Sequence, residues 1–365
     1  MLSEGVNEMK KEPLVSICIP NYNYGKYLSE CLDSILNQTY NNIEVFFRDN
    51  CSTDDSYDIA YSYKKKFKER GYFYSIANNK QNLGSSINSK LSIRDISGEY
   101  LYVLASDDII KETFVEKCVE VLNNNPNVVE VITHRDEIDE NGKITESPSF
   151  YNESCIIDGE SQAAIHMMAG IAIPGQRIIR SYLIDMRKNY ERHFQVAGDW
   201  FYNFLYCCFG DIAYIKEPLM QYRVHSGNET SVSERNLLGV LEHYNLLNAF
   251  KELSNIFDLK KPLDRYDEAV KKLGDMCLRY AIKMIRNGLS DIAEKYLFIA
   301  PAFKRDIINS DLYKELKECI VITQEEALKK LKDNKYIDIE KRTKSYNPPD
   351  GYKKINENGI VIDMV

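Results

Sequence analysis

Two adjacent carboxylates, Asp107 and Asp108, follow an apolar run at residues 100–105 after a single serine. The run has the length and composition of a strand buried on both faces, so the carboxylates are expected at the carboxyl edge of a sheet. Open α/β folds bind ligands at that edge, and hard divalent cations prefer oxygen donors of this kind. Ser106, Asp107 and Asp108 also form an ordinary helix N-cap sequence, so the pair alone leaves both a metal site and a cap open.

The segments around this run alternate between strand and helix patterns. Short apolar runs predict strands at residues 14–19, 43–47, 72–77, 100–105 and 128–133, and an extended segment at 212–222. Apolar spacing and caps predict helices at residues 28–36, 52–68, 87–96, 112–124 and 198–209. An Asn-Gly pair at 141–142 predicts a tight hairpin. The alternation predicts an α/β fold with a Rossmann-like, mostly parallel sheet.

The length of 365 residues exceeds what one core usually supports, so we expect more than one unit. Helical stripes after about residue 233 predict a C-terminal α-helical appendage at residues 233–334. The α/β domain is then expected at residues 13–232, after an N-terminal extension at residues 1–12. Residues 335–365 lack sustained periodicity and predict an irregular tail.

Composition narrows the class of protein. Apolar residues make up 44% and charged residues 28%, as in a globular protein with a sizeable core. A net charge of −8 and a pI near 5.4 argue against nucleic acid as a partner. The sequence has no apolar stretch of transmembrane length and begins with a polar segment, and its nine cysteines show no zinc-type spacing. We therefore expect a cytoplasmic protein without a transmembrane segment and with free thiols.

Polar residues end three of the predicted strands, at residues 20–23, 49–50 and 107–108. If these strands are parallel neighbours, their carboxyl ends converge and form a nucleotide pocket with a metal at its mouth. The sequence contains neither G-x-G-x-x-G after the first strand nor a P-loop, so a diphosphate would need a metal and basic groups. Arg223 suits phosphate pairing, and His225 is either an imidazole ligand or an exposed loop residue.

Six motifs, in this order and spacing, resemble the family 2 glycosyltransferases. The likeness covers about residues 13–231 and is strongest up to Asp108. The motifs are Val15-Ser16-Ile17-Cys18-Ile19-Pro20-Asn21-Tyr22-Asn23, Ser34-Ile35-Leu36-Asn37-Gln38-Thr39-Tyr40, Asp49-Asn50-Cys51-Ser52-Thr53-Asp54, Asn82-Leu83-Gly84, Gly98-Glu99-Tyr100 and Ser106-Asp107-Asp108.

The resemblance implies a GT-A fold, a nucleotide-diphosphate sugar donor, Mn²⁺ or Mg²⁺, and inversion at the anomeric carbon. By position it places Asp107 at the ribose or donor sugar and makes Asp108 a metal ligand, with His225 as a second candidate ligand. The remaining candidate donor contacts are Pro20 and Tyr22 along the base, Asp49 and Asn50 at the base edge, and Asn23, Gly84 and Arg223.

Two residues depart from the pattern of the family. Ala105 replaces the usual first carboxylate of its D-x-D motif, which puts the role of that position in doubt. Asn50 stands where many members have a second aspartate, so the expected preference for uridine is less secure.

Asp199 matches the position of the family's acidic base, which would remove the acceptor hydroxyl proton. Its alternative role is an N-cap of the following helix. Trp200, the only tryptophan, either stacks on a sugar or packs. The Gly175-Gln176-Arg177 segment lies between the metal and base regions and is a candidate acceptor or diphosphate contact.

The leading hypothesis is a metal-dependent inverting glycosyltransferase that uses a UDP-sugar to build a bacterial-type surface glycan or glycoconjugate. Its acceptor would be a hydroxyl group of a glycan, of a lipid-linked acceptor or of a protein. We also expect peripheral contact with a membrane and self-association through the C-terminal helices. A sugar nucleotidyltransferase is a second hypothesis, although residues 20–23 are not the glycine-rich loop that such an enzyme needs. A non-catalytic nucleotide-binding scaffold is a third, motivated by Ala105.

Overall fold

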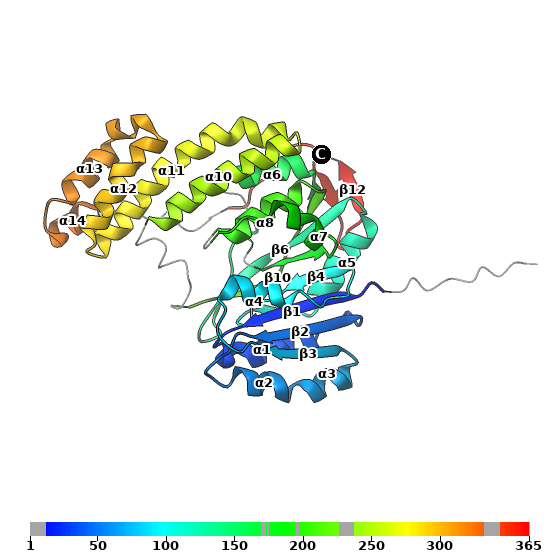
Figure 1. The fold of residues 1–365 in the computed structure, drawn as a ribbon. Helices are drawn as coiled ribbons and strands as arrows, with labels where there is room; N and C mark the ends of the chain where they lie inside the picture. The colour runs from blue at the N-terminus through cyan, green and yellow to red at the C-terminus, as the bar shows by residue number, and fades with distance from the viewer. Residues whose placement is uncertain are drawn as a thin grey trace, which may run out of the picture.

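The computed structural model describes residues 12–168, 173, 175–194, 197–225, 237–331 and 344–364. In this part of the chain, twelve strands form one sheet, shown in Figure 1. Its main path runs β12-β11-β8-β10-β6-β9-β4-β1-β2-β3, while β5 pairs with β10 and β7 with β6. The predicted α/β class is confirmed. The N-terminal extension lies outside the described residues except for its last position.

The half of the sheet that positions the site is parallel. Its strands are β1 (Val15–Asn21), β2 (Ile43–Asp49), β3 (Phe73–Asn78) and β4 (Tyr100–Val103). Asn21 pairs with Asp49, and Asp49 with Asn78, so the carboxyl ends of β1, β2 and β3 meet at one edge. The connecting helices are α1 (Gly25–Leu36), α2 (Ser56–Ser62), α3 (Lys64–Arg70) and α4 (Ser85–Ser92). The single helix predicted at 52–68 is two helices that meet at Tyr63.

The other half of the sheet is mixed. Its longest strands, β6 (Val128–Asp139) and β10 (Asp211–Val224), pair in parallel with register shifts around Pro218. The shorter strands are β5 (Ile109–Ile110), β7 (Ile144–Thr145), β8 (Cys155–Ile157) and β9 (Arg177–Arg180). The predicted Asn-Gly hairpin joins β6 to β7, with Gly142 in the left-handed region at φ 84°. The helices here are α5 (Phe114–Asn124), α6 (Gly159–Met167), α7 (Leu183–Arg187), the 3₁₀ helix η1 (Lys188–Tyr190) and α8 (Gly198–Cys207).

Helices cover both faces of the sheet and give it two apolar cores. One core lies between the sheet and helices α1, α3 and α5, and includes Leu28, Phe67 and Phe114. The other lies on the opposite face, against α6 and α8, and includes Ala163 and Phe204. Strands β1, β2 and β4 are thus mostly buried, which explains their largely apolar sequences, whereas β3 lies at the edge and is only partly buried.

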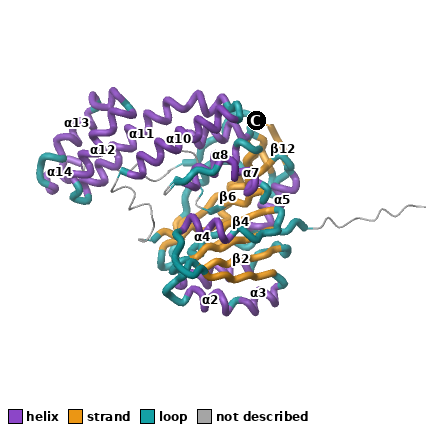
Figure 2. The backbone as a smooth tube through the Cα atoms, viewed as in Figure 1, coloured by secondary structure: helices purple, strands orange, loops and turns teal. Residues whose placement is uncertain are grey.

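The C-terminal helices form an arm that projects from the strand-rich part of the molecule (Figure 2). They are α10 (Leu238–Ile256), α11 (Lys260–Arg286), α12 (Ser290–Phe303), the 3₁₀ helix η3 (Arg305–Asn309), α13 (Asp311–Cys319) and α14 (Gln324–Leu331). The base of the arm shares the second core, because Phe250 of α10 stacks on Phe204 of α8 with ring centroids 4.1 Å apart. The outer helices have a separate core around Cys277 and Tyr296. The predicted boundary near residue 233 lies outside the described residues.

The prediction of an irregular C-terminal tail is wrong for its last part. Strands β11 (Lys353–Ile355) and β12 (Val361–Met364) extend the sheet, with β11 antiparallel to β8. The side chains of Asn124 at the end of α5 and of the C-cap residue Asn125 donate hydrogen bonds to the carbonyls of Asn358 and Gly359, respectively. Strands of three and four residues are too short to show periodicity, so backbone pairing decided their structure. In the described residues, we find no helix long and apolar enough to cross a membrane.

The packing of this segment on α5 can be tested with two glycines that both have positive φ. A Cβ on Gly359 (φ 70°) would lie 2.6 Å from the Cα of Val121, whereas one on Gly351 (φ 84°) would meet nothing within 4 Å. We expect Gly351→Ala to cost about 1 kcal/mol of unfolding free energy from backbone strain, and Gly359→Ala about 1–3 kcal/mol more from the clash. Chemical denaturation of both variants measures the difference, and equal costs would contradict the observed packing.

Candidate active site

The turn after β4 carries the two aspartates and is held against the end of β10. Asp108 is fully buried, and its Oδ1 accepts a hydrogen bond from the backbone N–H of Arg223 at 2.8 Å. Its Oδ2 is buried without a hydrogen-bond partner among the described residues. Burial and the neighbouring Asp107 raise the pKa of Asp108 well above its ordinary value. Asp108 therefore fixes the turn from inside the protein.

Asp107 and His225 are brought together by this arrangement. His225 Nε2 lies 3.1 Å from Asp107 Oδ2, and the two side chains are 10% and 12% exposed. The imidazole also packs against the rings of Tyr24, the N-cap residue of α1, and Tyr27 within α1, with centroids 5.6 and 5.9 Å away. Two donors at right angles and about 2.1 Å from one cation would be about 3 Å apart, so this pair fits a shared divalent ion. The described residues contain no group of three or more His, Cys, Asp or Glu that could hold a metal by themselves.

Arg223 is buried, and its guanidinium is occupied by protein groups. Its Nε donates to the carbonyl of Asp107 at 2.8 Å, and its terminal nitrogens donate to the Asp139 carbonyl and to Glu30 Oε2 at 3.1 and 2.7 Å. The guanidinium also lies 4.4 Å from the ring centre of Tyr27. These contacts favour a role in holding the Asp107 turn over the predicted phosphate contact.

Asp49 and Asn50 are also internal. The carboxylate of Asp49 accepts hydrogen bonds from Asn21 Nδ2 at 2.8 Å and from both the Oγ and the backbone N–H of Ser52. The Asn50 amide oxygen accepts from Asn79 Nδ2 and from the Leu83 N–H, each at 2.9 Å. Both side chains are at most 2% exposed, so they shape the loops instead of presenting free groups to a base edge. Sequence reasoning missed this amide network, for which the clustered asparagines at residues 78–88 were the available signal.

Among the residues that the structure describes, few remain open at this edge. Tyr22 is 40% exposed at the end of β1, next to the half-buried Pro20. Asn23 has a φ of 58°, and its side-chain oxygen accepts the Thr53 N–H at 2.8 Å, which joins the loops after β1 and β2. Gly84 (φ 82°) precedes α4, and a Cβ there would meet nothing within 4 Å. An exposed aromatic ring such as that of Tyr22 can accept a flat base.

Asp199 lies in the first turn of α8 and is exposed. The N-cap of α8 is Ala197, and no side chain caps it. The backbone N–H of Ala197 instead donates to Glu242 Oε2 of α10 at 2.8 Å. The alternative role of Asp199 as an N-cap is therefore not observed. Trp200 packs edge-on against His243 with ring centroids 6.3 Å apart.

A buried polar cluster adjoins α8. Arg177 Nη1 donates to Glu130 Oε1 at 3.2 Å and to Asn203 Oδ1. Glu130 is fully buried, and burial raises its pKa to about 7 even though the charge of Arg177 acts in the opposite direction. The structure ties Arg177 to β6 and α8, which makes the predicted acceptor or diphosphate contact less favourable for this residue.

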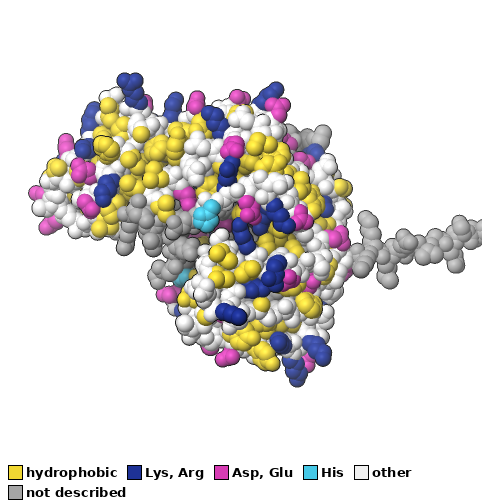
Figure 3. Space-filling view, viewed as in Figure 1, with side chains coloured by type: hydrophobic (Ala, Val, Ile, Leu, Met, Phe, Trp, Pro, Cys, Tyr) yellow, Lys and Arg dark blue, Asp and Glu magenta, His cyan; other side chains and the backbone are white. Residues whose placement is uncertain are grey.

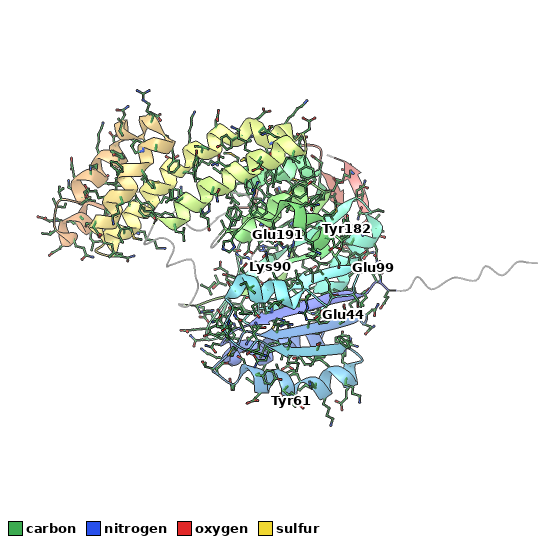
Figure 4. All side chains as sticks on the ribbon, in the orientation of Figure 1. Glu44, Tyr61, Lys90, Glu99, Tyr182 and Glu191 are labelled. Atoms are coloured by element: carbon green, nitrogen blue, oxygen red, sulfur yellow. The ribbon has the colours of Figure 1, made fainter. Side chains whose placement is uncertain are left out.

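A separate cavity of about 500 Å³ lies at the edge of the sheet opposite the aspartate site. One of its lining residues is Gly98, which comes just before the start of β4. Lys90 of α4 and Glu191, labelled in Figure 4, also line it and form an ion pair at 2.8 Å. Gly98 donates its N–H to the buried Glu44, which holds the starts of the strands together. The cavity is thus distinct from the aspartate site.

The family model for "Glycosyl transferase family 2" matches residues 16–219. The chain belongs to this family. The match ends within β10, before Arg223 and His225, which the sequence analysis had named as candidates. Family membership makes the chain a transferase enzyme and favours glycosyl transfer over the nucleotidyltransferase and scaffold hypotheses.

Three relatives among known proteins differ in how much of this chain they match. An uncharacterized glycosyltransferase of Haemophilus influenzae is 27% identical over 235 residues, 61% of this chain and 69% of that protein. The putative glycosyltransferase EpsH of Bacillus subtilis is 26% identical over 263 residues, a match that covers 70% of this chain and 74% of EpsH. The chondroitin synthase of Escherichia coli is 33% identical over 136 residues, 37% of this chain but 19% of that protein.

Solved structures support the fold. S. aureus TarS 1-349 in complex with UDP has a TM-score of 0.52 and 17% identity, and the match covers 84% of this chain and 90% of TarS 1-349. The complex of the same TarS fragment with UDP-GlcNAc gives a TM-score of 0.52 at 18% identity, with the same coverage. The predicted GT-A fold is confirmed by these similarities together with the family match.

The buried Glu130 predicts a pH dependence of stability. Its folded pKa of about 7 lies above the ordinary 4.5, so the folded state keeps a proton that the unfolded state loses between these values. Stability should therefore fall as the pH rises through this window. One pH unit of pKa difference corresponds to about 1.4 kcal/mol, so we expect a loss on the order of 3 kcal/mol.

Denaturant unfolding of the wild type and Glu130→Gln from pH 4.5 to pH 8 measures this loss. The variant lacks this titration, so the wild type should lose stability relative to it as the pH rises. A constant difference across the window would contradict the buried, shifted carboxyl group.

Proposed function

We propose that this glycosyltransferase transfers a sugar from a nucleotide-diphosphate donor, with a UDP-sugar favoured, to a hydroxyl acceptor, with inversion and with Mn²⁺ or Mg²⁺. The pairing of Asp107 with His225 at the carboxyl edge of the parallel strands carries the proposal. The UDP and UDP-GlcNAc complexes of the TarS fold relative support a nucleotide-sugar donor. A surface glycan or glycoconjugate is the product class that we propose.

Asp107 and His225 are the residues that we propose to hold the cation. The sequence assigned Asp108 to this role, but Asp108 is buried behind the turn and already accepts the Arg223 N–H. Divalent cations at phosphate sites commonly take only one or two protein ligands and the rest from substrate oxygens and water. When bound, the cation would neutralise charge on the departing diphosphate.

The nucleoside would lie against Tyr22 and Pro20. Tyr22 is the exposed ring at this edge, while Asp49 and Asn50 keep the flanking loops in place from inside. Ala105 offers no carboxylate, and its carbonyl accepts a hydrogen bond from the Cys31 thiol instead. We therefore propose that the ribose and the donor sugar lie beside Asp107 and beside the open backbone near Gly84.

Asp199 is the proposed general base. It is exposed and lies where the N-terminal end of α8 favours a carboxylate. As the acceptor oxygen bonds to carbon 1 of the sugar, its proton passes to Asp199, and the bond from carbon 1 to the diphosphate oxygen breaks on the opposite side. Neither a covalent enzyme intermediate nor a second nucleophile is needed.

The cellular setting is also a proposal. All nine cysteines are free and seven of them are buried, which supports a reducing, cytoplasmic compartment. Figure 3 shows hydrophobic side chains spread over the visible face of the helical arm. The exposed apolar residues of the arm include Leu241, Tyr244, Phe298 and Val321. We keep this arm as the candidate surface for self-association or for contact with a lipid-linked acceptor.

Titration calorimetry with UDP, with and without Mn²⁺, tests the cation site. We expect Asp107→Asn and His225→Ala to weaken Mn²⁺-dependent UDP binding at least about tenfold, because each removes one of two protein ligands. Asp185→Asn, an exposed carboxylate at the other edge, is the matched control and should bind as the wild type does. If only Asp108→Asn loses the metal dependence, Asp108 is the ligand and our assignment is wrong.

Asp199→Asn should keep Mn²⁺-dependent UDP binding and reduce turnover by about 10²–10⁴-fold, because the amide cannot accept the acceptor proton. Release of UDP from a panel of UDP-sugars with glycan acceptors provides the assay. A variant with wild-type turnover would exclude Asp199 as the base.

A further inference from the structure

We propose that the cavity of about 500 Å³ at the amino ends of the strands binds a small organic anion. Its phosphate or carboxylate group would pair with Arg187 and accept the hydroxyl proton of Ser181, and its apolar body would lie against isoleucine side chains and Tyr182. Gly98 of the cavity lining precedes β4, whereas Asp107 follows it, so this site is separate from the proposed donor site.

The walls of the cavity suit an apolar body. One wall comes from the end of α4 and the loop before β4, and it includes Ile93 and Ile96. The other comes from the segment after β9, and it includes Tyr182 and Ile184. Pockets for small molecules have volumes of roughly 300–1,000 Å³ and are lined mainly by apolar and aromatic side chains with a few polar groups. The volume and the walls therefore fit a molecule with a ring or a short chain.

The charges of the lining favour an anion. Basic side chains outnumber acidic ones by four to two, namely Lys90, Arg94, Arg187 and Lys188 against Asp185 and Glu191. Lys90 pairs with Glu191 at 2.8 Å and joins the two walls, as the labels in Figure 4 show. Lys188 pairs with Asp185 at 2.7 Å, and Arg94 with Asp95 at 3.0 Å. In the part of the chain that the structure describes, Arg187 is thus the cation of this lining that has no carboxylate within 4.0 Å.

Arg187 is held in place by two neutral rings of α8. Its Nη1 donates a hydrogen bond to the Tyr206 hydroxyl at 3.1 Å, and its guanidinium lies 4.5 Å from the ring centre of Tyr202. Its Nε is buried and has no hydrogen-bond partner among the described residues. A guanidinium has five N–H donors and can bind a carboxylate or a phosphate through two parallel hydrogen bonds. The tyrosines therefore orient this group but leave its charge without a counter-ion.

Ser181 adds a second polar group without a partner. Its Oγ is buried and makes no hydrogen bond to the described residues, although Ser181 lines the cavity. Its backbone N–H is already used, because it donates to the Glu99 carbonyl at 2.9 Å. A buried hydroxyl without a partner is unfavourable, and an anionic oxygen in the cavity would accept its proton in a hydrogen bond. Arg187 and Ser181 together thus provide donors for one anionic group.

The test is a ligand-observed NMR titration of the full chain with phenyl phosphate and with benzoate. Both molecules carry a ring, and they differ in the anionic group, so their affinities distinguish phosphate from carboxylate recognition. Benzyl alcohol is the neutral counterpart. We expect at least one anion to bind, and benzyl alcohol to bind at least about tenfold more weakly, because it cannot pair with Arg187. UDP and Mn²⁺ are present throughout to occupy the proposed donor site.

Two variants and a matched control locate the bound anion. Arg187→Gln should weaken its binding at least about tenfold. Arg265→Gln removes the same charge from an exposed ion pair with Glu268, outside the cavity lining, and should bind as the wild type does. Ser181→Ala should weaken binding about three- to tenfold, yet chemical denaturation should show no loss of stability, because the hydroxyl has no partner in the described residues of the free protein.

The proposal is overturned if neither anion binds the wild type, if benzyl alcohol binds as tightly as the anions, or if Arg187→Gln and Arg265→Gln bind them equally well. If Arg187→Gln does not fold, Ser181→Ala decides, because an unchanged affinity in that variant would place the anion elsewhere.

Discussion

The hydrogen bond from the Arg223 N–H to the buried Asp108 carboxylate is the contact on which the site depends. It joins the end of β4 to the end of β10, which are 115 residues apart in the chain. The Arg223 side chain then clamps the same turn through the Asp107 carbonyl and reaches Glu30 of α1. Arg223 thus fixes the turn through its backbone and its side chain, and Asp107 and His225 lie 3.1 Å apart. Preorganisation of this kind reduces what substrate binding must otherwise order.

Around α8, too, buried groups hold the surroundings of an exposed side chain. Asp199, the proposed base, is exposed, while buried groups from β6, β9 and α10 hold its surroundings. Glu242 bonds the start of the helix, and the Arg177 cluster bonds its side. Because Glu242 belongs to α10, the helical arm helps to hold α8 in place and shares its core through Phe250. The helical arm and the catalytic domain are thus joined at the base of the arm by a hydrogen bond and by aromatic packing.

Ala105 and Asn50, the two residues that depart from the family pattern, both make hydrogen bonds within the protein. At Ala105 the backbone carbonyl accepts the Cys31 thiol, which lies on the same helix as Tyr27 and Glu30. At Asn50 an amide replaces a charge, and its two functional groups bond Asn79, Asn82 and the backbone of Leu83. A neutral amide can both donate and accept in this network, whereas an ionised carboxylate could only accept.

The sequence alone determined the alternation of strands and helices and the Asn-Gly hairpin, and it placed the carboxyl ends of strands β1, β2 and β4 to within two residues, because these depend on local periodicity and turn chemistry. It also determined which motifs mark the family. It did not determine which polar side chains are buried: Asp108, Arg223, Asp49 and Asn50 have the same chemical types whether they face solvent or the interior. Only the tertiary structure decided that His225 meets Asp107, that Arg177 joins Glu130 beside α8, and that the last strands return to β8. Each of these contacts joins segments distant in sequence, and no local pattern encodes such a distance.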